Sequence, residues 1–184
     1  MSKKLPVFFA EGEPEKLLAA TSTQRDRCVL MIFLYAGLRC NELAHLKVSD
    51  LDFSRKVIWV RVAKGGKQRM VPMMKRLVGP LRGWVGPRRE GQVFPSTQGG
   101  GPMTTRALRY LVKRTAERAG FTGEALRRAH CHCFRHEFLC RALRAGADIR
   151  ELMDLAGHSQ LSSAQRYLAS DPDRLREAVD RVYE

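Results

Sequence analysis

Apolar residues recur at helical spacing along most of the chain, and short segments rich in glycine, proline and small polar residues separate these stretches. The apolar stretch at residues 28–38 is nearly continuous, so we expect its helix to be buried on most sides. Thr23 is placed to cap this helix and Gly37 to end it. Further helices are expected at residues 15–20, 40–46, 74–84, 104–119, 133–145, 149–156, 162–168 and 173–183.

A small amount of β-structure is expected in the first half of the chain. Residues 57–62 are rich in β-branched side chains and predict a strand, and residues 68–72 can return beside it after a turn at 64–67. Residues 93–94 are expected to add a short edge strand. The sequence therefore predicts a mainly α-helical fold with a small antiparallel β-sheet.

The length of 184 residues suits one domain with a sizeable core. The longest apolar run has eleven residues, which is too short to cross a bilayer, and residues 1–6 lack the apolar stretch of a signal peptide. Five cysteines are an odd number, and a chain of this size can fold without disulfides. We therefore expect reduced thiols, a cytoplasmic location and no membrane partner.

Positive charge is concentrated in the middle third of the chain. The 33 Lys and Arg residues outnumber the 19 Asp and Glu residues and give a formal net charge of +14 at pH 7. Residues 61–120 carry fourteen of the basic residues and only two acids, Glu90 and Glu117. Such a one-sided imbalance is typical of a surface that binds a polyanion, and nucleic acid is the leading candidate.

Six polar side chains stand out from the elements around them, and together they indicate a chemistry. They are Arg39, Lys64, His132, Arg135, His158 and Tyr167. Fixed cationic donors stabilise the extra negative charge of a phosphodiester transition state, and a tyrosine can act as a nucleophile that forms a covalent intermediate. The carboxylates of the chain form no obvious ligand set for magnesium, so this set favours a reaction that needs neither a metal ion nor another cofactor.

The residues around this set form motifs in a fixed order along the chain. They are AGLRCNEL at 36–43, KGGKQRMVP at 64–72, His132-x-x-Arg135-His136, Gly157-His158, and Tyr167 nine residues after His158. Together they resemble the tyrosine recombinases, the phage-integrase and Xer-like family, from about residue 5 to the C-terminus. The resemblance implies the catalytic-domain fold of that family and site-specific DNA recombination. Strands would be cleaved and rejoined by transesterification through a 3′-phosphotyrosyl intermediate.

The resemblance also implies a role for each residue of the set. The residues that match Arg39 and Arg135 bind the scissile phosphate in the family. Lys64 matches the general acid that protonates the leaving 5′ oxygen, and Tyr167 matches the nucleophile. These roles agree with the chemistry of the side chains, because lysine can donate a proton whereas arginine keeps its charge and suits a fixed clamp.

The other residues of the site are assigned to the phosphate and to the DNA backbone. His132 and His158 match two histidines that hydrogen-bond the phosphate and assist proton transfer in the family. Relatives place a helix corresponding to residues 104–119 against DNA. The predicted contacts to double-stranded DNA are Lys67, Arg69, Arg106, Arg109, Lys113 and Arg114.

The ends of the chain carry two further expectations. Residues 171–184 have an apolar stripe at Leu175, Val179 and Val182, and the family packs such a helix into a neighbouring protomer of a tetramer on synapsed DNA. Docking of this helix on its own domain is the alternative. Typical members carry a core-binding domain before this unit, so we expect residues 1–184 to be the catalytic domain alone. A bacterial or phage protein associated with the nucleoid is expected, and phage integration, movement of a mobile element and chromosome resolution all fit.

Three other interpretations are weaker on the same residues. Residues 129–133, with Cys140 nearby, are rich in zinc-ligand types, but their alternating Cys and His lack the paired spacing of zinc sites. A DNA-binding protein without catalysis would have lost at least one of the six residues, and none is missing. Type IB topoisomerases share the chemistry, but their chains are usually longer and lack the spacing between the hairpin and the helices that follow.

Overall fold

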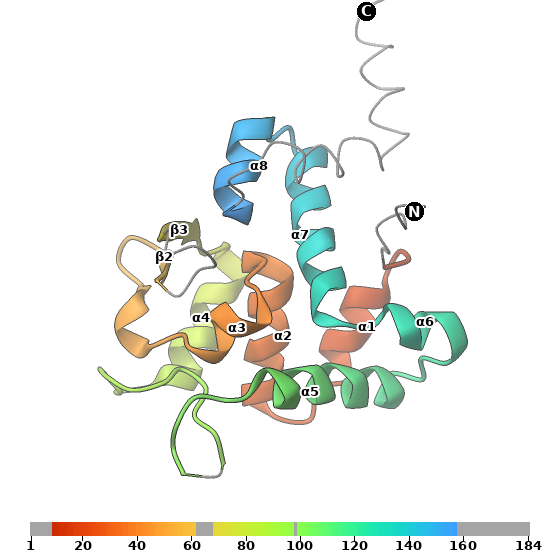
Figure 1. Cartoon of the computed structure of the whole chain (residues 1–184), viewed down its shortest axis with the longest axis horizontal. Coiled ribbons are helices and arrows are strands. Elements are labelled where there is room, and N and C mark those ends of the chain that lie inside the picture. The colour runs from red at the N-terminus through yellow and green to blue at the C-terminus, as the bar shows by residue number, and fades with distance from the viewer. Residues whose placement is uncertain (1–8, 62–67, 98, 158–184) are drawn as a thin grey trace, which may run out of the picture.

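Helices make up most of the described chain, which comprises residues 9–61, 68–97 and 99–157 of a computed structural model (Figure 1). Within these ranges the mainly α-helical architecture with a small antiparallel sheet confirms the prediction. The elements are α1 (Glu13–Ala19), α2 (Gln24–Ala36), α3 (Cys40–Ala44), the 3₁₀ helix η1 (Val48–Asp50), β1 (Leu51–Asp52), β2 (Val57–Val60), β3 (Arg69–Pro72), α4 (Lys75–Val85), α5 (Thr105–Arg118), α6 (Gly123–Arg128), α7 (Cys131–Arg144) and α8 (Ile149–Ala156). The helices expected at 162–168 and 173–183 and the turn at 64–67 lie outside the described residues.

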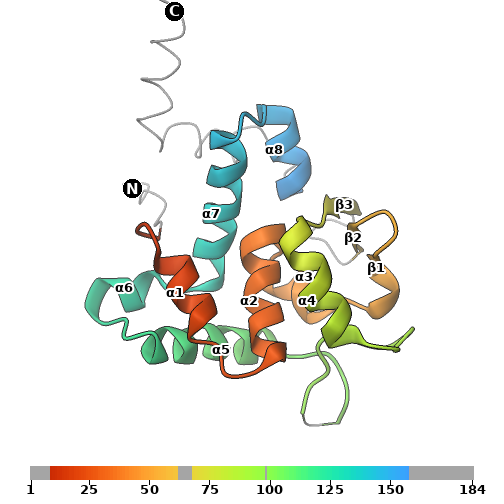
Figure 2. The same cartoon turned by 180° about the vertical axis from the view of Figure 1, so that it is seen from behind.

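The central helix α2 begins and ends where its sequence predicts. The Thr23 hydroxyl accepts a hydrogen bond from the Asp26 backbone N–H at 3.0 Å, and Gly37 ends the helix in the left-handed conformation with φ +59°. Residues 28–36 are all buried, as their continuous apolar pattern predicts. Figures 1 and 2 show α4 on one side of α2 and α1 and α7 on the other. The core therefore forms around α2.

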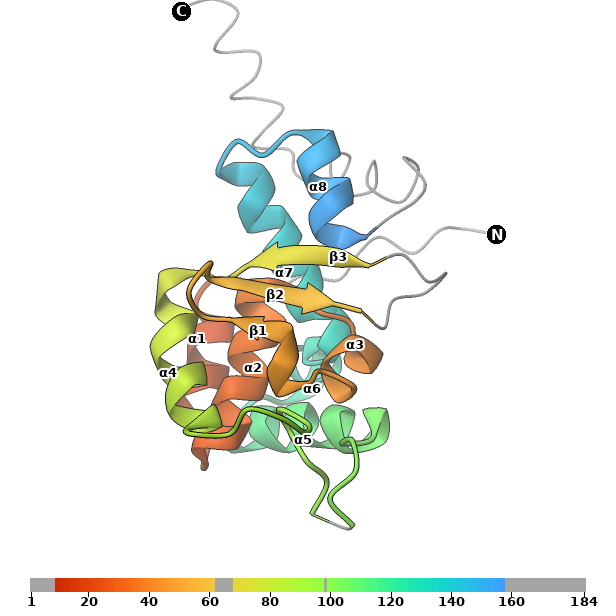
Figure 3. The same cartoon turned by 90° about the vertical axis from the view of Figure 1, so that its left-hand side faces the viewer.

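The sheet lies beside this core (Figure 3). The order of its described strands is β1-β2-β3, and each strand is antiparallel to its neighbour. The buried side chains of Ile58 and Val71 lie opposite each other in the β2–β3 register. The prediction of an edge strand at residues 93–94 is wrong. Both side chains are buried there, but the Val93 backbone N–H donates to the Leu46 carbonyl at 2.8 Å in an isolated contact outside the sheet.

One helix, α6, was not expected, and the starts of α1 and α7 and the end of α3 each lie two residues from their expected positions. Helix α6 was not predicted, because its six residues include only two apolar ones, Ala125 and Leu126, which are adjacent and only partly buried and so form no stripe at helical spacing. Helix α7 begins at Cys131, two residues before the expected start, because His130 already has the extended conformation of a helix N-cap. None of the helices in the described ranges combines the length and apolarity needed to cross a membrane.

The last described helix, α8, packs on the C-terminal half of α7 and lies above β3 (Figures 1 and 3). The Asp148 carboxylate caps it by accepting hydrogen bonds from the backbone N–H groups of Arg150 and Glu151 at 2.7 and 2.9 Å. Gly157 ends it in the left-handed conformation with φ +56°. The end of α8 therefore lies close to β3 of the sheet.

Candidate active site

Arg39 stands between the end of α2 and the start of α3, at the N-cap of α3. One oxygen of the Glu42 carboxylate accepts a hydrogen bond from the Arg39 backbone N–H at 2.7 Å. The other oxygen accepts from Arg39 Nη1 at 2.9 Å. A quarter of the Arg39 side chain is exposed, whereas that of Glu42 is buried. The cap therefore holds the Arg39 guanidinium at the surface while its counter-ion stays inside.

Arg135 is buried in α7 and holds the ends of two other helices. Its guanidinium donates hydrogen bonds to the carbonyl oxygens of Gly37, at 2.5 Å, and of Ala156. These carbonyls lie at the C-terminal ends of α2 and α8, where backbone oxygens lack partners within the helix. Arginine keeps its proton even when it is buried, so Arg135 is a fixed positive charge at the junction of three helices.

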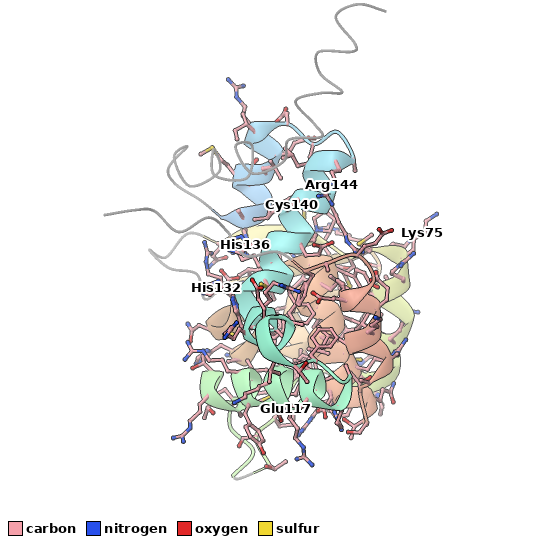
Figure 4. The ribbon with its side chains drawn as sticks, turned by 90° about the vertical axis from the view of Figure 1, so that its right-hand side faces the viewer. Lys75, Glu117, His132, His136, Cys140 and Arg144 are labelled. Carbon is pink, nitrogen blue, oxygen red and sulfur yellow. The ribbon has the colours of Figure 1, made fainter. Side chains whose placement is uncertain are left out.

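His132 lies on the same helix, three residues before Arg135, and reaches the surface of the molecule (Figure 4). Partial desolvation lowers the pKa of His132, and the positive charges of Arg135, Arg39 and Arg109 lower it further. The imidazole is therefore neutral at pH 7 and can accept a proton or a hydrogen bond. A phosphate bound beside it would offset the arginine charges and raise this pKa again.

The starts of α3 and α7 and the middle of α5 come together beside His132. The thiols of Cys40 and Cys131, the first residues of α3 and α7, lie side by side and interact. This interaction lowers the pKa of the Cys40 thiol, burial opposes the shift, and the Arg109 guanidinium lowers it further. Three segments that are distant in sequence thus assemble a site in which cationic groups surround one neutral imidazole.

The structure corrects the predicted role of Arg69. The sequence analysis placed Arg69 among the DNA contacts, but its side chain is only 8% exposed. Its Nη1 and Nη2 donate to the two carboxylate oxygens of Glu42, each at 2.8 Å, and its Nε donates to the Leu155 carbonyl at 3.1 Å. The guanidinium is therefore turned inward and used within the protein.

Glu42 lies at this site and was not among the residues predicted from the sequence. Burial alone would raise the pKa of Glu42, but hydrogen bonds and charge from Arg69, together with hydrogen bonds from Arg39, outweigh it and hold the pKa at about 2. The carboxylate is therefore ionised at pH 7. Its position three residues after Arg39 at a helix start is the spacing of a capping box, and this signal could have revealed it.

The basic residues of α5 divide between two sides of the helix. Thr104 caps the helix by accepting from the Ala107 N–H at 3.0 Å, and the four predicted DNA contacts on it are all exposed. Arg106, Arg109 and Lys113 follow one another at helical spacing on the side that faces α3 and His132. Arg114 instead lines a separate hollow of about 360 Å³ together with Tyr110.

The remaining predicted site residues, Lys64, Lys67, His158 and Tyr167, lie outside the described residues. The ranges that flank them end at the site: β3 begins at Arg69, and Gly157 packs against the Arg69 side chain. Among the described residues, no three or more His, Cys, Asp or Glu side chains are grouped so that they could hold a metal ion.

Comparison with known proteins places this site in a family. The profile of the phage integrase family matches residues 8–174. Tyrosine recombinase XerA of Pyrococcus horikoshii is 30% identical over 98% of this chain and 62% of its own length. The chain thus spans about three fifths of that relative.

Solved structures agree with the sequence comparison. The crystal structure of XerA recombinase superposes with a TM-score of 0.82 at 27% identity, over 100% of this chain and 67% of that one. XerH site-specific recombinase, bound to a palindromic difH substrate after cleavage, gives a TM-score of 0.76 at 25% identity, over 98% of this chain and 54% of that one. The fold is that of a tyrosine recombinase catalytic domain, and the chain belongs to the phage integrase family.

Proposed function

We propose that this chain is the catalytic domain of a tyrosine site-specific recombinase, which cleaves and rejoins double-stranded DNA through a 3′-phosphotyrosyl intermediate. The observation that carries the proposal is the assembly of Arg39, His132 and Arg135 at one place from helices far apart in sequence. A fixed guanidinium, a surface guanidinium and a neutral imidazole suit a phosphate whose negative charge increases in the transition state. The names of the relatives support the same reaction.

The proposed reaction is a pair of transesterifications. The Tyr167 hydroxyl gives its proton to a neutral histidine of the site as its oxygen attacks the phosphorus, which forms a Tyr–phosphate ester and breaks the bond from phosphorus to the 5′ oxygen. Lys64 gives that oxygen its proton, and Arg39 and Arg135 hold the non-bridging oxygens. His132, neutral in the free protein, and His158 hydrogen-bond the phosphate and assist the proton transfers. In the second step the 5′ hydroxyl of a partner strand gives its proton to Lys64 and attacks the phosphotyrosine, and the freed Tyr167 oxygen takes back the proton held by the histidine.

Covalent trapping tests this proposal. When the wild-type chain is incubated with a nicked duplex that releases the leaving strand by diffusion, we expect a protein–DNA adduct that survives denaturing electrophoresis. The adduct should form equally well in EDTA, because the cations of the proposed site are protein side chains. Cleavage that leaves no adduct, or that requires a divalent ion, would indicate a nuclease mechanism, and DNA binding without cleavage would indicate a binding protein.

The DNA surface is proposed to follow the side of α5 that faces the site, and two arginines of this helix provide a matched test. Arg109→Ala should weaken DNA binding and reduce the slope of log K against log salt by about 0.9, the value for one phosphate contact. Arg114→Ala, which alters the separate hollow, should leave that slope unchanged. Fluorescence anisotropy at several salt concentrations measures both variants. Equal slopes for the two variants would contradict the assignment of the DNA to one side of α5.

Assembly and location stay predictions. The apolar stripe at Leu175, Val179 and Val182 supports a helix that packs into a neighbouring protomer of a tetramer on paired DNA sites. The net charge of +14 supports association with the nucleoid of a bacterial or phage-infected cell.

A further inference from the structure

We propose that Arg69 is a positioning residue for strand cleavage. By neutralising the buried Glu42 carboxylate, Arg69 leaves the charge of Arg39 available to the phosphate. This inference rests on the proposed function. Arg69 lies at the start of β3 and contacts two other parts of the site, the start of α3 through Glu42 and the end of α8 through Leu155. Arg69 therefore acts on the reacting groups indirectly, through these neighbours. Its own side chain is only 8% exposed.

The charges of Arg39, Glu42 and Arg69 form a triad that carries one net positive charge. Both oxygens of Glu42 are engaged by the planar fork of Arg69, which is the strongest geometry for an arginine and a carboxylate. The Arg39 guanidinium contributes one hydrogen bond, from Nη1 to an oxygen that Arg69 also engages. The side chains of Glu42 and Arg69 are buried and that of Arg39 is a quarter exposed, so the uncompensated charge lies at Arg39, at the surface.

Without Arg69, the same carboxylate would act against the site. Glu42 would remain buried with Arg39 beside it, and a buried carboxylate binds a neighbouring guanidinium with both oxygens when it can. Arg39 would then be drawn inward and its charge neutralised. The loss of Arg69 should therefore weaken the hold of Arg39 on the phosphate, although Arg69 does not touch the phosphate.

Arg69 also fixes the end of α8. Its Nε bonds the Leu155 carbonyl, while Arg135 bonds the carbonyl of Ala156, the next residue. A Cβ atom placed on Gly157 would lie 3.0 Å from the Arg69 side chain, so the chain passes directly against this arginine as α8 ends. Exposed carbonyls at a helix C-terminus attract cations, which explains why two guanidinium groups gather there.

A double-mutant design separates charge compensation from simple support of the fold. Arg69→Met should slow formation of the covalent adduct about 10²-fold, the lower end of the range for losing one donor to a developing negative charge. Arg69→Met combined with Glu42→Gln restores the net charge of the triad to +1 and should recover at least about tenfold of the lost rate. Glu42→Gln alone should not exceed the wild-type rate, because it leaves two guanidinium groups together.

Arg88→Met is the matched control. Arg88 also donates hydrogen bonds to helix-end carbonyls, those of Trp84 and Val85, but it lies at the end of α4, away from the site. The Arg88→Met variant should lose some thermal stability and should form the adduct at the wild-type rate. All rates are measured well below the unfolding midpoint of each variant.

The outcomes are distinct. Recovery in the double variant supports the proposal, whereas a double variant as slow as Arg69→Met, or slower, overturns it and leaves Arg69 a structural residue. A folded Arg69→Lys variant, which keeps the charge, should retain the rate within about tenfold, and a loss as large as that of Arg69→Met contradicts the proposal. DNA affinity, measured by anisotropy, follows the same pattern without requiring cleavage. If the wild-type chain forms no adduct, the proposed function fails, and this affinity measurement still decides the role of Arg69.

Discussion

Tyr167→Phe is expected to abolish the covalent protein–DNA adduct while DNA affinity stays at the wild-type value. Phenylalanine keeps the ring and lacks the oxygen that would attack the phosphorus, so the intermediate cannot form at all. The cations that bind the phosphate and backbone are unchanged, and they supply most of the affinity. Incubation with a nicked duplex in EDTA followed by denaturing electrophoresis measures the adduct, and anisotropy measures binding.

Tyr110→Phe is the control for this experiment. Tyr110 is 64% exposed on the basic helix α5, so it is the described tyrosine with the most accessible hydroxyl. Its replacement should leave adduct formation unchanged. An adduct that persists in Tyr167→Phe and disappears in Tyr110→Phe would move the nucleophile to α5, and an adduct that persists in both would remove Tyr167 from the role.

Lys64→Ala is expected to slow cleavage of ordinary DNA by about 10²–10⁴-fold, the usual contribution of a general acid. The loss should be largely rescued on DNA in which sulfur replaces the bridging 5′ oxygen at the cleavage site. A thiolate leaves without a proton, because the pKa of a thiol is near 8.5, whereas an alkoxide is a poor leaving group. Single-turnover cleavage of the two substrates gives the rescue as a ratio of rates.

The same pair of substrates tests the neighbouring cations. Arg39→Ala should cleave both substrates slowly. The Arg39 guanidinium stabilises the non-bridging oxygens, and a better leaving group does not compensate for the loss of that stabilisation. Lys67 is the rival donor, three residues further along. Rescue of Lys67→Ala without rescue of Lys64→Ala would exchange their roles. If neither lysine variant is rescued, the proton comes from another group, and His132 is the next candidate.

The helices that could be predicted from the sequence are those whose signals are local. Thr23, Thr104 and Asp148 each accept a hydrogen bond from a backbone N–H two or three residues further on. Such a cap depends on the residue and its immediate neighbours, so the starts of α2, α5 and α8 follow from the sequence. Helix α6, which has six residues, and β1, which has two, carry too little pattern to be found in this way.

The candidate site shows the same division. The identities, order and spacing of Arg39, His132 and Arg135 could be read along the chain, because the chemistry of phosphate transfer restricts which side chains can serve. Their meeting depends on packing, since the carbonyls that hold Arg135 belong to α2 and α8, 98 and 21 residues away. The pattern of motifs implied that these residues share a site. The physical cause of their meeting is the hydrogen bonding of Arg135 to the ends of α2 and α8.

By itself, then, the sequence determined the helical class, the capped helices and the set of residues suited to the chemistry. It could not distinguish a basic residue that faces DNA from one that is neutralised inside the protein. Arg69 stands in a basic hairpin segment and looks like a DNA contact, yet its partners are Glu42 and Leu155, 27 and 86 residues away. A guanidinium turns inward when buried acceptors, such as a carboxylate or helix-end carbonyls, lie within its reach, and only the tertiary structure brings such partners together.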